Sequence, residues 1–576
     1  MRATRLILSG LLIATVTATS QQSANAASDQ PVAAKNGMVV SAHKRASTAG
    51  VDVLKQGGNA IDAAVAVGYA LAVTFPAAGN LGGGGFMTIR MANGQKHFID
   101  FRETAPLAAT ATMFQNTKGE VQPDLSRRGY LAAGIPGTVA GLEMARNKYG
   151  TKPRAALMEA AIKLARDGYM LEQGDVDLLG EATEDFRKDG PSAAVFLANG
   201  ALRITGTRLV QADLAQSLQL IARDGPKAFY QGVIGQKIVA ASQKNGGIFT
   251  MADFAGYQAR ELPPLECNYR GWQIISAPPP SSGGIVLCET LNILEGYPIS
   301  ALGFGSAQGT HYVIEALRRA YHDRNLNLGD PSFVKFDTAH YIDKGYAARL
   351  RAGINPDKAT PSDSLPAPGP GKEGQNTTHY SIVDRQGNAV SVTYTINDWF
   401  GARVMPAGTG ILLNDEMDDF SAKPGAPNMF GLVEGLNNAI APGKRPLSSM
   451  SPTIVAKDDK LVMVVGTPGG SRIPTAVLQV MVNVLDHGMT IEEAVDAPRI
   501  HQQWMPDVTY FERHALSPDT MRLLTDKGQK LEEIDYGNHI AAILVGAPRL
   551  GGKPIGRNTL YGSIDPRINL GSVEGY

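Results

Sequence analysis

The spacing of apolar and polar positions changes along the chain and predicts a layered protein with both helices and strands. Near the N-terminus, Met38 to Ser41 is typical of a short strand and Ser47 to Gln56 of a helix. Ala60 to Phe75 is apolar on nearly every face, which predicts a buried helix. A hairpin with strands over Phe86 to Arg90 and His97 to Phe101 is expected next.

The middle and the end of the chain differ in period. From about Pro136 to Leu350 the pattern is mainly helical, and the Pro, Gly and Ser residues of Pro361 to Gly374 predict an exposed linker. Beyond the linker the period becomes two. Strands are expected over His379 to Asp384, Ala389 to Ile396, Pro452 to Ala456 and Leu461 to Val465, before a helix over Ile473 to Leu485. Helices around antiparallel hairpins favour an α+β fold.

Residues 1–26 have the pattern of a secretory signal. Arg2 and Arg5 form the charged start, Leu6 to Ala18 is mostly apolar, and Ala24-Asn25-Ala26 is a small-residue cleavage site. A membrane anchor is the alternative, but the apolar run is shorter than the roughly 20 residues that span a bilayer. We therefore expect a periplasmic or secreted protein, cut after Ala26, with no membrane span in its mature form.

The net charge and the cysteine content of the chain argue against several classes of function. Without the two arginines of the signal, 54 acidic residues exceed the basic ones by two, and no basic run is present. The chain therefore offers no electrostatic reason to bind nucleic acid, and we expect a small-molecule partner. Cys267 and Cys288 are the only cysteines, which excludes a disulfide framework but leaves one bridge open. The ten scattered histidines lack the spacing of a zinc helix, so no metal or other cofactor is expected.

The tripeptide Asn376-Thr377-Thr378 lies where the linker meets a strand. A threonine hydroxyl is a poor nucleophile without a nearby base, and the closest base is its own α-amine once the preceding peptide bond is cut. If Thr377 becomes a chain terminus, the protein is an amide-cleaving enzyme that first cuts itself. The tripeptide also matches a glycosylation acceptor or a strand start, so it does not decide the function alone.

Gly469 and Gly470 follow a predicted strand and precede a predicted helix. Backbone N–H groups at a helix start stabilise negative charge, so this loop is a candidate oxyanion hole. An ordinary strand-to-helix turn is the alternative. A phosphate loop is disfavoured because no Gly-Lys-Ser/Thr follows.

A second group of residues could bind the head group of an amino acid. The acidic run from Asn414 to Phe420 would hold an ammonium if it lines a pocket, although such runs usually face solvent. It lacks the ligand spacing and the central glycine of a calcium loop. Arg102, at a strand end, offers a bidentate clamp for a carboxylate, and Ser448 and Ser449 offer hydroxyl donors.

With these motifs, the chain resembles the γ-glutamyltranspeptidases, members of the N-terminal-nucleophile hydrolases. The resemblance covers nearly the whole mature chain in the family's order. The matching segments are Gly57 to Ala64, Gly82 to Phe86, Asp100 to Glu103, Pro279 to Gly284, Thr377 to Ser381, Met417 to Phe420, Arg445 to Pro452 and Pro468 to Arg472.

The resemblance implies a four-layer αββα sandwich whose precursor cuts itself between Asn376 and Thr377. The large subunit would comprise residues 27–376 and the small catalytic subunit residues 377–576, associated as a heterodimer in one composite globular domain. It further implies that Thr377 is the nucleophile, that Thr395 orients it and that Gly469 and Gly470 form the oxyanion hole. The α-carboxylate of the substrate would be held by Arg102, Ser448 and Ser449, and its α-ammonium by Asn397, Glu416 and Asp419.

The implied activity is that of a γ-glutamyltransferase and glutathione hydrolase. Glutathione or another γ-glutamyl compound would form a γ-glutamyl-enzyme, resolved by water or by an amino acid or peptide acceptor. A β-lactam acylase of the same fold is disfavoured by Glu416 and Asp419, and a periplasmic solute-binding protein would need neither Thr377 nor cleavage. Bacterial members often place a lid tyrosine against the equivalent of Asn397. Because Phe430 stands there instead, we expect easier lid opening and an altered balance of transfer and hydrolysis.

Overall fold

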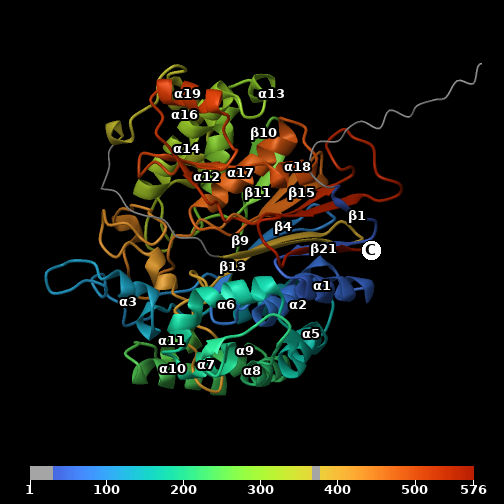
Figure 1. Cartoon of the computed structure of the whole chain (residues 1–576), viewed down its shortest axis with the longest axis vertical. Coiled ribbons are helices and arrows are strands. Elements are labelled where there is room, and N and C mark those ends of the chain that lie inside the picture. The colour runs from blue at the N-terminus through green and yellow to red at the C-terminus, as the bar shows by residue number, and fades with distance from the viewer. Residues whose placement is uncertain (1–29, 366–376) are drawn as a thin grey trace, which may run out of the picture.

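Two seven-stranded antiparallel sheets lie face to face between two layers of helices (Figure 1). The computed structural model describes residues 30–365 and 377–576. The first sheet has the order β1 (Val32–Ala34), β20 (Leu560–Ile564), β19 (Ala541–Val545), β15 (Lys460–Gly466), β14 (Thr453–Lys457), β11 (Trp272–Ser276) and β10 (Leu265–Tyr269). The second has the order β21 (Ser572–Gly575), β2 (Met38–Ser41), β12 (Thr378–Val383), β13 (Ala389–Thr395), β3 (Gly84–Arg90), β4 (Lys96–Asp100) and β9 (Arg260–Leu262). The predicted αββα sandwich is confirmed.

Helices cover the outer face of each sheet. In Figure 1 the helices on the first sheet lie above the strands and those on the second sheet lie below them. The upper layer contains α12 (Gly283–Leu294), α14 (Ala307–Asn327), α16 (Lys344–Ala352), α17 (Arg472–Leu485) and α18 (Ile491–Asp496). The lower layer contains α1 (Lys44–Lys55), α2 (Ala60–Thr74), α4 (Thr138–Tyr149), α5 (Arg154–Asp167) and α8 (Ala212–Asp224).

Further helices and three small sheets surround these layers. The remaining α-helices are α3 (Pro123–Arg127), α6 (Gln173–Phe186), α7 (Gly190–Phe196), α9 (Pro226–Tyr230), α10 (Val233–Lys244), α11 (Met251–Gly256), α13 (Ile299–Leu302), α15 (Thr338–Tyr341) and α19 (Pro518–Asp526). Two two-stranded sheets pair β5 (Tyr169–Met170) with β8 (Arg208–Leu209) and β6 (Leu197–Ala198) with β7 (Ala201–Leu202). A three-stranded sheet joins β16 (Ile500–His501), β17 (Thr509–Glu512) and β18 (Leu531–Ile534).

Helix α2 explains how an almost wholly apolar segment tolerates one carboxylate. Every residue of α2 is buried, including Asp62. The Asn59 side chain accepts a hydrogen bond from the backbone N–H of Asp62, and the Asp62 carboxylate accepts one from Asn59 N–H, which forms a capping box. Asp62 also accepts hydrogen bonds from the backbone N–H groups of Thr151 and Lys152, at 2.8 and 3.0 Å. The buried charge therefore joins α2 to the loop before α5.

The two cysteines form a disulfide, which the sequence left open. Cys267 on β10 and Cys288 on α12 have Cα atoms 6.0 Å apart. The bridge ties an edge strand of the first sheet to the helix that covers it. Among the described residues, no helix is long and apolar enough to cross a membrane. The proposed signal, residues 1–26, lies outside the described part of the chain.

Candidate active site

Thr377 immediately precedes β12, near the middle of the second sheet. Thr378 pairs with Tyr394 on β13, and Thr395 is the next residue of that strand, so the two threonines lie at neighbouring strand ends. Both are buried, and both line one pocket with about 300 Å³ of empty space. The pairing of β12 with β13 thus places the candidate nucleophile Thr377 next to Thr395. Asn376 lies outside the described residues.

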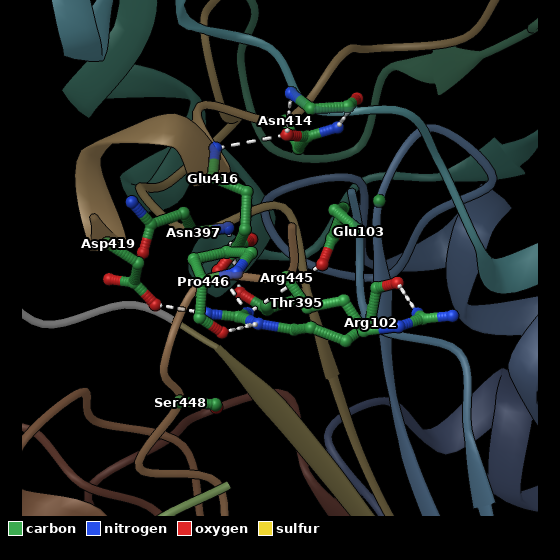
Figure 2. Close-up of polar contacts among 12 residues, drawn as sticks. Arg102, Glu103, Thr395, Asn397, Asn414, Glu416, Asp419, Arg445, Pro446 and Ser448 are labelled. Carbon is green, nitrogen blue, oxygen red and sulfur yellow. Dashed lines mark hydrogen bonds and ion pairs between the residues drawn. The ribbon is translucent and has the colours of Figure 1, made fainter. Parts of the chain in front are cut away.

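Arg102 is the charged centre of this pocket. It follows β4, and its guanidinium forms ion pairs with Glu416 through Nη1 and with Asp419 through Nη2 (Figure 2). Nε of Arg102 donates a hydrogen bond to the carbonyl of Pro446 at 3.3 Å. The acidic run is therefore a pocket wall and does not face solvent. The residues expected to bind the opposite charges of a substrate form ion pairs with one another.

Burial and crowding shift the protonation of this cluster. Burial acts to lower the pKa of Arg102, but Glu416, Asp419 and Glu103 raise it above its ordinary value, so the guanidinium stays charged. Burial raises the pKa of Glu416 well above its usual range, against the effect of Arg102. Burial likewise raises the pKa of Glu103 to about 7. One arginine thus faces three carboxylates, which favours a cationic group in the pocket.

Asn397 and Asn414 hold the loops on either side of the cluster. Asn397 has a left-handed backbone with φ of 75°; its N–H donates to Thr395 Oγ1 at 2.8 Å and its Nδ2 to the carbonyl of Asp415 at 3.1 Å. Asn414 Nδ2 donates to the carbonyl of Gly82 at 2.7 Å. Asn414 Oδ1 accepts from Glu416 N–H at 3.0 Å (Figure 2). These bonds position Glu416 against the Gly82 loop.

Gly469 and Gly470 occupy backbone conformations that other residues rarely adopt. Their φ angles are 127° and 55°, and they lie between β15 and α17. A Cβ added to Gly470 would lie 2.2 Å from Cδ1 of Phe430. Gly470 lines the pocket directly, and Gly469 precedes it. The sequence-predicted donor loop therefore borders Thr377, and its glycines are required by both conformation and space.

Ser448 and Ser449 lie in an extended segment held against the start of α12. Ser448 N–H donates to the carbonyl of Pro280 at 2.9 Å, and Ser282 Oγ donates to the carbonyl of Ser448 at 2.7 Å. Through these contacts the Pro-Pro-Ser-Ser-Gly-Gly motif at the start of α12 supports the segment that carries the two serines. It positions both candidate serines in the pocket wall.

The predicted lid segment, Pro424 to Gly435, packs over the pocket through Phe430. The Phe430 ring is buried beside Gly470, while Asn397 Nδ2 donates to Sδ of the preceding Met429 at 3.4 Å. A thioether is a weak acceptor. Asn397 thus contacts the lid through the sulfur of the residue before Phe430, which is a weaker contact than the tyrosine hydroxyl of the bacterial members would give.

The structure brings together nine of the ten predicted catalytic and substrate-binding residues as lining of one pocket. They are Thr377, Thr395, Gly470, Arg102, Asn397, Glu416, Asp419, Ser448 and Ser449. Sequence reasoning missed Arg324, which also lines the pocket from α14, together with the apolar Leu432, Leu447, Met450 and Ile473. Arg324 lies inside a helical pattern with two other arginines, Arg318 and Arg319, so nothing in the local sequence distinguishes it.

Comparison with known proteins agrees with this geometry. The model of the γ-glutamyltranspeptidase family matches residues 46–572. The chain belongs to this family. It is similar to a glutathione hydrolase proenzyme of Pseudomonas sp. (strain A14), with 61% identity over 98% of both chains. A glutathione hydrolase proenzyme of Escherichia coli (strain K12) is 50% identical over 95% of this chain and 93% of its own.

Solved structures extend the likeness of this γ-glutamyltranspeptidase family member to its fold. The crystal structure of a cephalosporin acylase from Bacillus halodurans superposes with a TM-score of 0.82 at 27% identity. The match covers 97% of this chain and 99% of the acylase. Proteins named glutathione hydrolase and one named cephalosporin acylase are both similar to this chain. The fold therefore does not determine the substrate, which must follow from the residues of the pocket.

Proposed function

We propose that this chain is an exported γ-glutamyltransferase and glutathione hydrolase that matures by cutting itself between Asn376 and Thr377. The proposal is supported by the family match, by the proenzyme relatives and by the position of Thr377 in the same pocket as Arg102 and Asp419. The last observation carries the most weight, because it combines a nucleophile with partners for both charges of an amino-acid head group.

In the proposed reaction, the Thr377 α-amine accepts the proton of the Thr377 hydroxyl as Oγ attacks the γ-carbonyl carbon. The N–H groups of Gly469 and Gly470 stabilise the oxyanion. The C–N bond then breaks, and the ammonium returns the proton to the leaving amine, which leaves a γ-glutamyl ester on Thr377. Water or an acceptor amine of an amino acid or peptide attacks this ester and restores the hydroxyl.

Substrate choice in the proposal follows from charge. The α-carboxylate of the donor would bind Arg102, Ser448 and Ser449, and its α-ammonium would bind Asn397, Glu416 and Asp419. A glutaryl donor lacks the ammonium and would leave two buried carboxylates without that partner, which is unfavourable. A γ-glutamyl donor is therefore preferred over the side chain of a glutaryl cephalosporin.

The processing step is tested by denaturing electrophoresis of the purified protein. Wild type should give two bands, for residues 27–376 and 377–576, and Thr377→Ala should give one band of full mature mass. N-terminal sequencing should find Thr377 on the small chain and Ala27 on the large chain when the protein is exported to the periplasm or medium. A single wild-type band that persists on incubation contradicts self-processing.

The substrate is tested with γ-glutamyl-p-nitroanilide, with and without a dipeptide acceptor. Release of nitroaniline that rises with the acceptor supports transfer, and release without it supports hydrolysis. Turnover of glutaryl-p-nitroanilide alone would assign the chain to the acylases.

A further inference from the structure

Arg324 is a second arginine of the pocket. It projects from α14, its side chain is buried, and it lines the same pocket as Thr377 and Arg102. Its guanidinium contacts three separate parts of the chain. Nε donates to Ser282 Oγ at 3.2 Å, Nη2 donates to Ser449 Oγ at 3.4 Å, and Nη1 forms an ion pair with Glu434 of the lid segment.

The charge of Arg324 is compensated from within the protein. One carboxylate oxygen of Glu434 binds Arg324, and the other accepts a hydrogen bond from Asn438 Nδ2. Asn438 Nδ2 also donates to the carbonyl of Asp419 at 2.6 Å. Arg324 is therefore fixed by its ion pair with Glu434, in contrast to Arg102, whose partners are the predicted ligands of the substrate ammonium.

In both serine contacts Arg324 is the hydrogen-bond donor and the serine hydroxyl is the acceptor. A hydroxyl has one hydrogen to donate, so a serine that accepts from Arg324 keeps that hydrogen for another acceptor. Ser282 follows this pattern, since its Oγ accepts from Arg324 and donates to the carbonyl of Ser448 at 2.7 Å. Ser449 Oγ accepts from Arg324 in the same way, in a pocket where a substrate carboxylate is the acceptor that remains.

We propose that Arg324 is a positioning residue for the α-carboxylate of the donor. By donating to Ser449 Oγ, Arg324 turns the hydroxyl hydrogen of Ser449 toward that carboxylate. It also polarises the hydroxyl, which strengthens the hydrogen bond from Ser449 to the carboxylate. Through Ser282 it also holds the segment that carries Ser448. This inference rests on the proposed role of Ser449 in substrate binding.

The test compares two donors that differ only in the α-carboxylate, γ-glutamyl-p-nitroanilide and 4-aminobutyryl-p-nitroanilide. Arg324→Met should lower kcat/KM for the γ-glutamyl donor about tenfold, mainly through KM, because it weakens one hydrogen bond to a charged group. The same variant should change kcat/KM for the 4-aminobutyryl donor by less than about twofold. Arg324→Lys, which keeps the charge but loses the fork, should show a smaller selective loss.

Two further variants separate the possible failures. Arg319 lies on the same helix, is similarly buried and pairs with Glu315, but it does not line the pocket, so Arg319→Met controls for the loss of a buried arginine. It should affect both donors alike. Ser449→Ala should show the same donor-selective loss as Arg324→Met. Electrophoresis of each variant checks that both chains are present.

A loss confined to the γ-glutamyl donor in the Arg324 variants supports the inference. An equal loss on both donors, or none on either, overturns it, and Arg324→Lys decides the case if Arg324→Met does not mature. A selective loss in Ser449→Ala without one in the Arg324 variants leaves the proposed function intact and overturns only the inference. No selective loss in Ser449→Ala overturns the proposed role of Ser449 and with it the route from Arg324.

Discussion

Arg102, Glu416 and Asp419 form an ion-pair cluster, which a γ-glutamyl donor bound as proposed would have to reorganise. In the structure the guanidinium is held by the same carboxylates that are proposed to take the substrate ammonium. A zwitterionic head group can replace these contacts one for one, since it supplies a carboxylate for Arg102 and an ammonium for the acids. A substrate with only one of these charges leaves part of the cluster uncompensated.

Asp419 is the residue at which this argument is tested. Asp419→Asn should lower kcat/KM for γ-glutamyl-p-nitroanilide at least about thirtyfold, because it removes one member of a buried charge pair. Turnover of glutaryl-p-nitroanilide, which has no ammonium, should fall much less. The measurement is initial rate against donor concentration for both compounds. Equal losses on the two donors would show that Asp419 supports the pocket without selecting the ammonium.

Glu103 gives the fold a dependence on pH. Burial raises the pKa of Glu103 to about 7 from an ordinary 4.5. At pH values between these two, the folded state keeps a proton on Glu103 that the unfolded state has released. This contribution to stability is full below pH 4.5 and is lost as the pH rises through about 7. Glu103→Gln should therefore lose less stability than the parent between pH 5 and pH 8.

The comparison is made in a Thr377→Ala background, where the chain is expected to stay in one piece and subunit dissociation does not complicate unfolding. Thermal midpoints are measured across the pH range with and without Glu103→Gln. Parallel curves for the two proteins would contradict the assignment of the proton to Glu103.

At the scale of elements, the lid segment forms part of the pocket wall through Phe430 and Leu432. Phe430 covers Gly470, but Asn397 reaches only the Met429 sulfur. Phe430→Tyr would add a hydroxyl at the lid and should raise the ratio of transfer to hydrolysis, because a lid that stays closed excludes water from the ester. The ratio is measured from nitroaniline release and dipeptide product at a fixed acceptor concentration. Identical ratios and rates for variant and parent would mean that the lid hydroxyl has no influence.

At the scale of the whole molecule, one disulfide joins the edge of the first sheet to its helical cover. Removing it in Cys267→Ser/Cys288→Ser should lower the free energy of unfolding by about 2–4 kcal/mol. The site should be little affected, because Ser282, at the start of α12, is held by its own bonds to Ser448 and Arg324. Calorimetry should show a lower thermal midpoint and assays a KM within about twofold of the parent. Reduced wild type is the control and should unfold like the variant; an unchanged midpoint would contradict a stabilising role.

Local pattern in the sequence predicted an α+β protein and most elements of the catalytic core, and the resemblance to the family implied the αββα sandwich. The period-two strands around Thr377, the apolar helix after Asn59 and the glycines at 469 and 470 each impose a backbone conformation that neighbours in sequence determine. Strands β10, β11, β19 and β20 were not predicted. β11 pairs with β14 and β19 pairs with β15, and these partners lie far away in the chain, where no local window contains them.

The tertiary structure determined the contacts between residues that lie apart in the sequence. It joined Cys267 to Cys288, paired Arg102 with both Glu416 and Asp419, and placed Arg324 against Ser449 across more than a hundred residues of chain. Sequence determined which chemical groups the protein carries and the local conformations that present them. Only the packing of the two sheets and their helical layers determined which of these groups come into contact. A buried charge is costly without a partner, and the fold limits which partners lie close enough to pair with it.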